Sequence, residues 1–165
     1  NVDDEAMMGK IMDALASISR DIATIFPVHP RTRQHIADLG PRTSDLEMVE
    51  PLGYIDFLAL QRNATLVITD SGGIQEETTF LGVPCLTLRE NTERPITVTL
   101  GTNTLVGHDM DRLRSEVPRV LSGGYRNGQV PPLWDGHAAE RIAAAVSTWQ
   151  DTGRLITTAS PGERP

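Results

Sequence analysis

Apolar residues recur at three- and four-residue spacing near the N-terminus, and short apolar runs follow at regular intervals along the chain. The first pattern predicts an amphipathic helix over residues 4–22. The same spacing predicts further helices or helical turns at 31–39, 54–61, 72–81, 96–100, 109–121 and 138–149. Short runs of apolar and β-branched residues predict strands at 24–28, 46–49, 65–69, 84–88 and 103–106.

Two residues with special backbone properties refine these predictions. Gly82 follows a helical segment and is expected to cap it. Pro118 lies inside another helical segment and is expected to break it, because proline lacks the N–H that the helix needs. The main domain is expected to span residues 1–150. Residues 151–165 are polar without periodicity and are expected to form a tail.

The alternation of strands and helices indicates βαβ units, and hence an α/β fold with a Rossmann-like, doubly wound parallel sheet. The runs LVIT and CLTL, at 66–69 and 85–88, are apolar throughout and predict strands buried on both faces. The chain starts on a helix, although such units usually start on a strand. This start indicates a piece of a larger protein whose first strand lies upstream.

Composition narrows the functional classes. The chain has 165 residues and a net charge of −7, which argues against a general binder of nucleic acid or of anionic membranes. No apolar stretch approaches the ~20 residues that span a bilayer. Cys85 is the only cysteine, so an internal disulfide is impossible, and a reducing compartment, the cytoplasm, is expected.

Two adjacent glycines occupy the start of the helix predicted over 72–81, in the sequence TDSGGIQEE. A helix start offers unpaired N–H groups and a positive dipole end, and glycines let a phosphate approach them closely. Ser71 can cap the helix or donate to the ligand, and Glu77, in the second turn, can accept from a ribose diol. A simple capped helix start explains Ser71 and Glu76, but it leaves the paired glycines unexplained.

Arg94 follows the next strand of the predicted sheet, in the sequence RENTERP. Neighbouring parallel strands end at the same edge, so Arg94 can reach a diphosphate bound at the Ser71 turn. The alternative is an exposed ion pair with Glu90 or Glu93, which contributes little to stability. The spacing alone leaves both interpretations open.

These motifs resemble the nucleotide-binding core of the non-hydrolysing UDP-N-acetylglucosamine 2-epimerases. The similarity is carried by TDSGGIQEETTFLGVPCLTLRENTERPITVTLGTNTLVG, supported by FPVHPRTR, EPLGYIDFLALQRNATLVITDSGG and WDGHAAERI. It runs from about Asn1 to about Val146, and DSGGIQEE together with TERP makes it specific.

The resemblance implies one half of a two-domain, glycosyltransferase-B-like fold, with UDP in the cleft between the domains. The implied reaction converts UDP-GlcNAc to UDP-ManNAc by eliminating UDP and adding it back, without a metal or a cofactor. The catalytic carboxylates are expected in an N-terminal domain that this chain does not include, so the chain alone is expected to be inactive. The implied partners are UDP, a UDP-N-acetylhexosamine and that domain; the oligomeric state stays open.

Carried over by position, the resemblance also assigns binding residues. Ser71, Gly72, Gly73 and Arg94 would contact the diphosphate, Glu77 the ribose and Phe57 the uracil. His29 matches a position linked to a second, regulatory nucleotide sugar, although a lone histidine before a proline is more often structural. Three alternatives remain: a UDP-sugar-dependent glycosyltransferase, a hydrolysing epimerase, and a nucleotide-binding module without chemistry.

Overall fold

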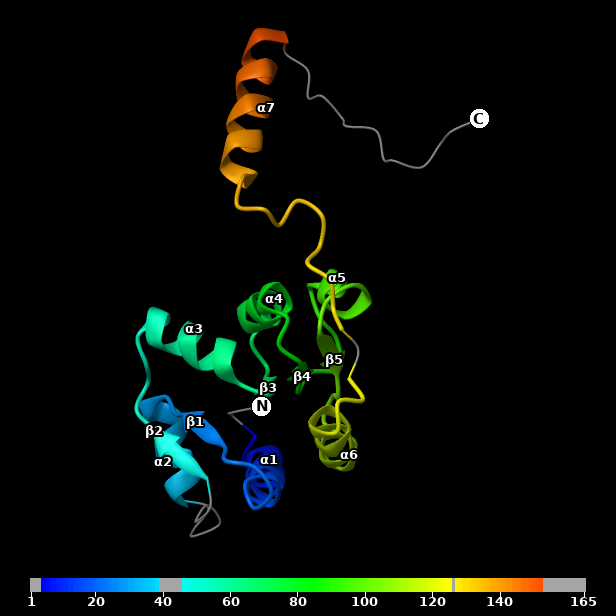
Figure 1. Cartoon of the computed structure of the whole chain (residues 1–165). Coiled ribbons are helices and arrows are strands. Elements are labelled where there is room, and N and C mark those ends of the chain that lie inside the picture. Colours follow the sequence, from blue (N-terminus) through cyan, green and yellow to red (C-terminus); the bar gives the residue numbers. More distant parts are fainter. Residues whose placement is uncertain (1–3, 39–45, 126, 153–165) are drawn as a thin grey trace. The chain divides into compact units, whose positions relative to one another are not determined.

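A computed structural model describes residues 4–38, 46–125 and 127–152 (Figure 1). The chain forms two compact units, residues 1–130 and residues 131–165. In the described part of the chain, none of the helices combines the length and the apolar character needed to cross a membrane.

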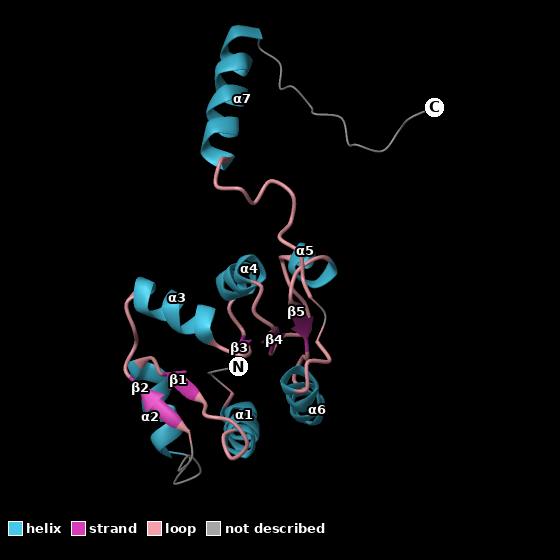
Figure 2. Cartoon of the chain, viewed as in Figure 1, coloured by secondary structure: helices cyan, strands magenta, loops and turns pink. Residues whose placement is uncertain are grey.

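Helices and strands alternate through the first unit, as the sequence predicts (Figure 2). The elements are α1 (Glu5–Ile18), β1 (Ile25–Pro27), α2 (Pro30–Asp38), β2 (Glu47–Val49), α3 (Tyr54–Asn63), β3 (Val67–Thr69), α4 (Gly72–Leu81), β4 (Cys85–Thr87), α5 (Pro95–Thr99), β5 (Asn103–Leu105) and α6 (Met110–Leu121). The second unit contains α7 (Ala138–Thr152), and the remainder of the expected tail lies outside the described residues.

All strand pairs among the described residues are parallel, which confirms the α/β class, but the strands form two sheets. One sheet pairs β1 with β2, and the other has the order β3-β4-β5. Strand β4 is fully buried, as expected for a central strand. The matching expectation for β3 is wrong, because Val67 and Ile68 are only half-buried. The reason is that β3 has a single partner strand in the described structure and so lies at an edge.

Helices cover both faces of the three-stranded sheet. Figure 1 shows α4 and α5 on one side of β3–β5 and α6 on the other. Helix α1 packs against α6. The apolar core that contains the buried residues of α1 and α6 also includes a residue that follows β1 and a residue of α2. Both sheets therefore share one core. Its most buried members include Met12, Ala14, Val28, Ile36, Leu86, Val106 and Leu113.

Helix ends differ from the sequence predictions in ways that follow from local hydrogen bonds. Helix α1 ends at Ile18 rather than at residue 22, and the N–H groups of Asp21 and Ile22 both donate to the Ile18 carbonyl in a closing turn. The expected break at Pro118 is wrong, because α6 continues to Leu121. Pro118 removes only one backbone N–H, near the end of this helix, and its ring is exposed, so the ring displaces no buried side chain.

Two other local predictions are confirmed. Gly82 ends α4 in a left-handed conformation with φ of 73°, where glycine carries no Cβ penalty. Cys85 is fully buried in β4, and this burial raises the pKa of its thiol. A protonated thiol without exposure behaves as a small apolar side chain, so Cys85 has a structural role in the core.

A bidentate ion pair links the segment before helix α7 to the first turn of that helix, in the second unit. The Arg141 guanidinium donates to both Asp135 oxygens at 2.9 and 2.8 Å, and the His137 N–H donates to the same carboxylate at 3.0 Å. These donors, Arg141 foremost, lower the pKa of Asp135 to about 2. The pair therefore stabilises this segment above the ordinary carboxyl pKa of about 4. That stabilisation is lost as the pH falls through about 2.

We predict that the Asp135 carboxyl titrates near pH 2 in a carbon-13 NMR titration, because Arg141 and His137 favour its charged form. Arg141→Gln removes the first of these donors and should move the midpoint up toward about 4. An Asp135 midpoint near 4 in the unaltered protein would contradict the ion pair.

Candidate nucleotide-binding site

The turn between β3 and α4 presents the start of a helix at the end of a strand. Ser71 is the N-cap residue, in an extended conformation, and its N–H donates to Oγ1 of Thr69 at 3.1 Å. Its exposed side chain makes no capping hydrogen bond within the described part of the chain, so the capping interpretation of this hydroxyl is wrong. The first N–H groups of α4 also lack partners within the helix. The turn therefore presents the Ser71 hydroxyl and the first N–H groups of α4 as hydrogen-bond donors for a ligand.

The two glycines at this turn differ in their surroundings. A Cβ atom at Gly72 would lie 2.6 Å from Nη1 and 2.8 Å from Cζ of Arg94. A Cβ atom at Gly73 would have only Oγ of Ser71 near it, at 4.0 Å. Gly72 is thus required for the close approach of a cation to the helix start. Gly73 leaves open space in which a bulky group can approach the backbone.

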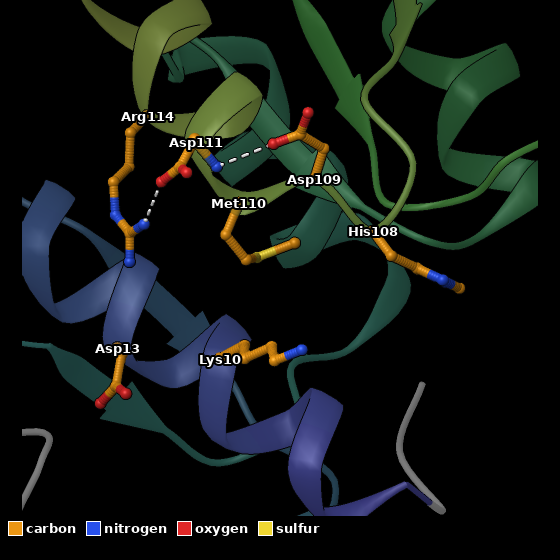
Figure 3. Close-up of a pocket in the computed structure, with 7 residues that line it drawn as sticks. All are labelled: Lys10, Asp13, His108, Asp109, Met110, Asp111 and Arg114. Carbon is orange, nitrogen blue, oxygen red and sulfur yellow. Dashed lines mark hydrogen bonds and ion pairs between the residues drawn. The ribbon is translucent and has the colours of Figure 1, made fainter.

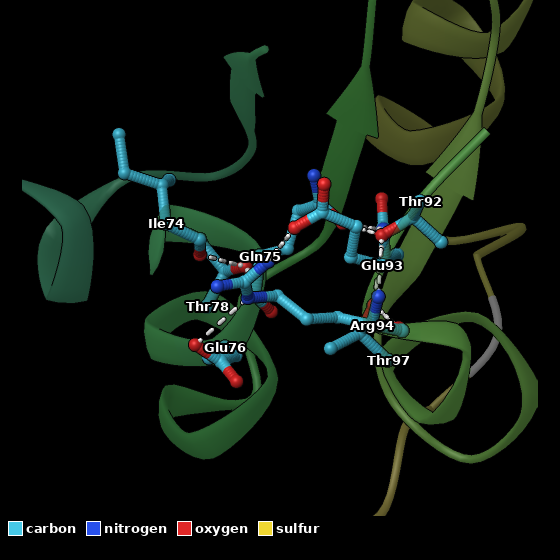
Figure 4. A network of polar contacts seen from close by, with 9 residues as sticks. Ile74, Gln75, Glu76, Thr78, Thr92, Glu93, Arg94 and Thr97 are labelled. Carbon is cyan, nitrogen blue, oxygen red and sulfur yellow. Dashed lines mark hydrogen bonds and ion pairs between the residues drawn. The ribbon is translucent and has the colours of Figure 1, made fainter. Parts of the chain in front are cut away.

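Arg94 reaches this helix start from the loop that follows β4, where it is the N-cap residue of α5. Its Nε lies 3.1 Å from Glu76 and its Nη1 lies 3.3 Å from Glu93 (Figure 4). The contact with Glu76 is an ion pair without hydrogen-bond geometry. The Glu76 carboxylate, and after it Glu93, raise the pKa of the Arg94 guanidinium.

The ion-pair interpretation of Arg94 is confirmed for one of its two expected partners, and the diphosphate interpretation stays a prediction. Arg94 pairs with Glu93, as the alternative interpretation had it, while Glu90 instead accepts from the His108 N–H at 3.0 Å. It also lies over Gly72, where a diphosphate would meet it. Because the Arg94 side chain is 34% exposed, water screens its ion pairs, which are therefore weak competitors for an incoming phosphate.

Glu77 lies in the next turn of α4, with its carboxylate oriented by a residue of α3. The Nε2 group of Gln61 donates to Oε2 of Glu77 at 2.6 Å, and Gln61 is only 2% exposed. Sequence reasoning missed Gln61, although a polar residue four positions after Phe57 in a predicted helix was the available signal. Residues four apart share a helix face, so half-buried Phe57 lies on the same side of α3 as Gln61.

His29 is placed elsewhere. It lies two residues after the end of β1, a strand of the two-stranded sheet, and just before α2, and it is exposed. The Ser71 turn belongs to the other sheet. The regulatory role of His29 stays a prediction.

A pocket of about 320 Å³ lies between α1 and the start of α6 (Figure 3). It is lined by Lys10, Asp13, His108, Asp109, Met110, Asp111 and Arg114. Its acids already serve the helix: Asp109 accepts from the N–H groups of Asp111 and Arg112, and Asp111 pairs with Arg114 at 2.9 Å. None of the sequence candidates lines this pocket, so the Ser71 turn is the better candidate for a site.

The fold and the turn together define a class: a Rossmann-like α/β domain in which a glycine-containing helix start follows the carboxyl end of a parallel strand, an arrangement typical of anion sites. A sequence profile described as UDP-N-acetylglucosamine 2-epimerase matches residues 1–147. The chain therefore belongs to the UDP-N-acetylglucosamine 2-epimerase family, which confirms the resemblance.

Individual relatives agree with this assignment. The UDP-N-acetylglucosamine 2-epimerase of Methanocaldococcus jannaschii is 40% identical over 154 residues, covering 89% of this chain and 42% of that protein. A UDP-2,3-diacetamido-2,3-dideoxy-D-glucuronate 2-epimerase of Pseudomonas aeruginosa is also 40% identical, over 87% of this chain and 40% of that protein. The chain thus spans about two fifths of the length of these curated relatives.

A solved structure shows the same fold. The Methanocaldococcus jannaschii UDP-GlcNAc 2-epimerase in complex with UDP-GlcNAc and UDP matches 90% of this chain, with a TM-score of 0.76 and 38% identity. The chain covers 42% of that structure. This likeness confirms the glycosyltransferase-B-like class expected from the sequence.

Proposed function

We propose that the chain is the UDP-binding part of a 2-epimerase that interconverts UDP-GlcNAc and UDP-ManNAc. The observation that carries this proposal is the position of Arg94 over Gly72, beside an exposed Ser71 hydroxyl and bare N–H groups. The similar Methanocaldococcus jannaschii enzyme was solved in complex with UDP-GlcNAc and UDP, which supports the same choice of ligand. The proposed compartment is the cytoplasm, since the single buried thiol needs no oxidising environment.

Each residue of the site has a proposed task. The Ser71 hydroxyl and the N–H groups of Gly72 and Gly73 donate to the diphosphate, and Arg94 adds a positive charge. Glu77, held by Gln61, accepts from the ribose hydroxyls. Phe57 lies against the uracil. Together these groups stabilise the diphosphate as its bond to the sugar breaks, which is where negative charge develops during elimination.

The proton chemistry at the sugar belongs to residues outside this chain, so the 165-residue chain alone is proposed to be inactive. Turnover of UDP-GlcNAc to UDP-ManNAc by this chain alone, followed by proton NMR, would refute that statement. Which N-acetylated sugar the longer protein takes is a separate question, because a relative named for a diacetamido-glucuronate is as similar as one named for GlcNAc.

The first strand of the domain is proposed to lie upstream of residue 1. Strands β1 and β3 each have a single partner strand among the described residues. Helix α1 precedes β1 in the chain, as the helix of a parallel βαβ unit precedes its second strand. A parallel βαβ unit needs a strand before α1, and such a strand between β1 and β3 would join the two sheets. Amides of β3 should then exchange more slowly with deuterium in a longer form of the protein. Equal exchange in both forms would contradict this arrangement.

We predict that UDP binds and that Ser71→Ala and Glu77→Ala each weaken binding about 10- to 100-fold, measured by titration calorimetry. Each change removes a hydrogen bond to a charged group, and such a bond contributes about 1.5–3 kcal/mol. Ser115→Ala on α6 and Glu47→Ala on β2 are matched exposed controls, expected to bind as the unaltered protein does. Absence of UDP binding by a folded, longer form would overturn the proposed function.

A further inference from the structure

Beneath the candidate site lies a set of polar side chains that are almost fully buried. Gln75 and Asn103 are each 1% exposed, and Thr97 is 0% exposed. Burying such groups is costly unless they are hydrogen-bonded to one another. The carboxamide oxygen of Gln75 accepts from Oγ1 of Thr92 at 2.7 Å and from Nδ2 of Asn103 at 3.0 Å. Gln75 is thus the point at which two branches of this network meet.

Both branches end on the backbone of Arg94 (Figure 4). In the first branch, the Arg94 N–H donates to Oγ1 of Thr92 at 3.0 Å. In the second, Asn103 donates to Oγ1 of Thr97 at 3.1 Å, and that hydroxyl donates to the Arg94 carbonyl at 2.8 Å. The Arg94 N–H is therefore linked to the Gln75 side chain through Thr92 alone. Its carbonyl, which also accepts from the Thr97 N–H at 3.0 Å, is linked to Gln75 more remotely, through Thr97 and Asn103.

Gln75 itself belongs to α4, one turn after Gly72. The network therefore connects the helix that carries the bare N–H groups to the loop that carries the cation. A residue with so little exposure does not touch a ligand at the surface of the turn. Its side chain can act on a ligand only indirectly, and Arg94 is the candidate site residue that its network reaches.

We infer that Gln75 is a positioning residue, which holds the Arg94 guanidinium at the distance from Gly72 that a diphosphate requires. This inference rests on the proposed function, because it assumes that UDP binds at the Ser71 turn. It goes beyond that proposal by assigning a role to a residue that contacts no ligand. A purely structural role for Gln75 would change stability without a specific effect on Arg94.

A double-mutant cycle with UDP as the probe separates these roles. Gln75→Met keeps the side-chain length and removes the acceptor, so the dissociation constant for UDP should rise about tenfold. In an Arg94→Ala background the same change should alter it by less than about twofold, because the residue it positions is gone. Equal losses in both backgrounds would overturn the inference.

Thr92→Val provides a second variant that does not depend on how well Gln75→Met folds. It removes the hydroxyl that links Gln75 to the Arg94 N–H, and it should reproduce the tenfold loss. Thr24→Val is the matched control, since Thr24 is also half-buried and its hydroxyl donates to the Ile22 carbonyl, away from Arg94. Unchanged UDP affinity in Thr92→Val would overturn the inference.

An NMR measurement without UDP separates failure of this inference from failure of the proposed function. If Gln75 positions Arg94, the Nε–H signal of Arg94 should shift and lose order in both variants, while that of Arg141 in the second unit stays unchanged. An Arg94 signal that is the same in all proteins would overturn the inference. Absence of UDP binding by the unaltered protein would count against the proposed function. The comparison of the Arg94 signals would still test whether Gln75 positions Arg94.

Discussion

Replacing Gly72 with alanine is expected to weaken UDP binding about 100-fold while the protein remains folded. The new Cβ would lie 2.6 Å from Nη1 of Arg94, so the guanidinium has to leave its place over the helix start. The guanidinium is the far end of a flexible, one-third exposed side chain, so it moves at little cost to folding. The diphosphate loses the arginine and meets a methyl group where it would approach the backbone.

Titration calorimetry with UDP measures the loss, and urea unfolding followed by circular dichroism shows whether the fold has changed. Gly9→Ala in α1 is the matched control, because a Cβ atom there has no neighbour within 4 Å. It should bind UDP normally and gain up to about 1 kcal/mol of stability from the better helix former. If Gly72→Ala binds UDP within twofold of the unaltered protein, the close approach of Arg94 has no role in binding.

The sequence predicts the local part of this site well. A strand followed by a serine and two glycines specifies a turn into a helix, and Gly82 specifies its end, because these preferences depend on a few neighbouring residues. The resemblance predicts that Ser71, Glu77 and Arg94 are binding residues. It does not show that Gly72 and Gly73 differ, because the difference depends on where Arg94 lies.

The contacts that orient the site depend on residues far apart in the chain. Gln61 holds Glu77 across 16 positions, and Asn103 reaches Gln75 across 28 positions. No local pattern encodes such pairs, since each partner taken alone is an ordinary polar residue in a helix or a strand. The half-buried state of β3 has a similar origin, because the burial of a strand depends on which strands flank it.

Contacts around Arg94 also reconcile the acidic composition of the chain with the proposed diphosphate site. The net charge of −7 excludes broad attraction to anions, yet a diphosphate needs only a few fixed donors. Glu76 and Glu93 lie 3.1 and 3.3 Å from nitrogen atoms of the Arg94 guanidinium, which lies beside Gly72. The carboxylates that make the chain acidic therefore also help to place its cation, and the buried network fixes the backbone from which that cation extends.

Replacing Leu113 with alanine is expected to destabilise the protein by about 2–5 kcal/mol. Leu113 is fully buried in α6, which packs against α1 and covers the three-stranded sheet. Each described strand has only three residues, and the two sheets are not joined by strand pairing among the described residues. The apolar core shared by α1, α6 and both sheets must therefore carry much of the stability, and a cavity in it is costly.

Urea unfolding followed by circular dichroism measures this effect as a lower midpoint with an unchanged slope. Leu121→Ala is the matched control, because Leu121 lies in the same helix and is 39% exposed. It repeats the change in helix propensity without a buried cavity, so its cost should stay below about 1 kcal/mol. Similar losses for the two variants would show that the helix itself, rather than the shared core, holds the two sheets in one unit.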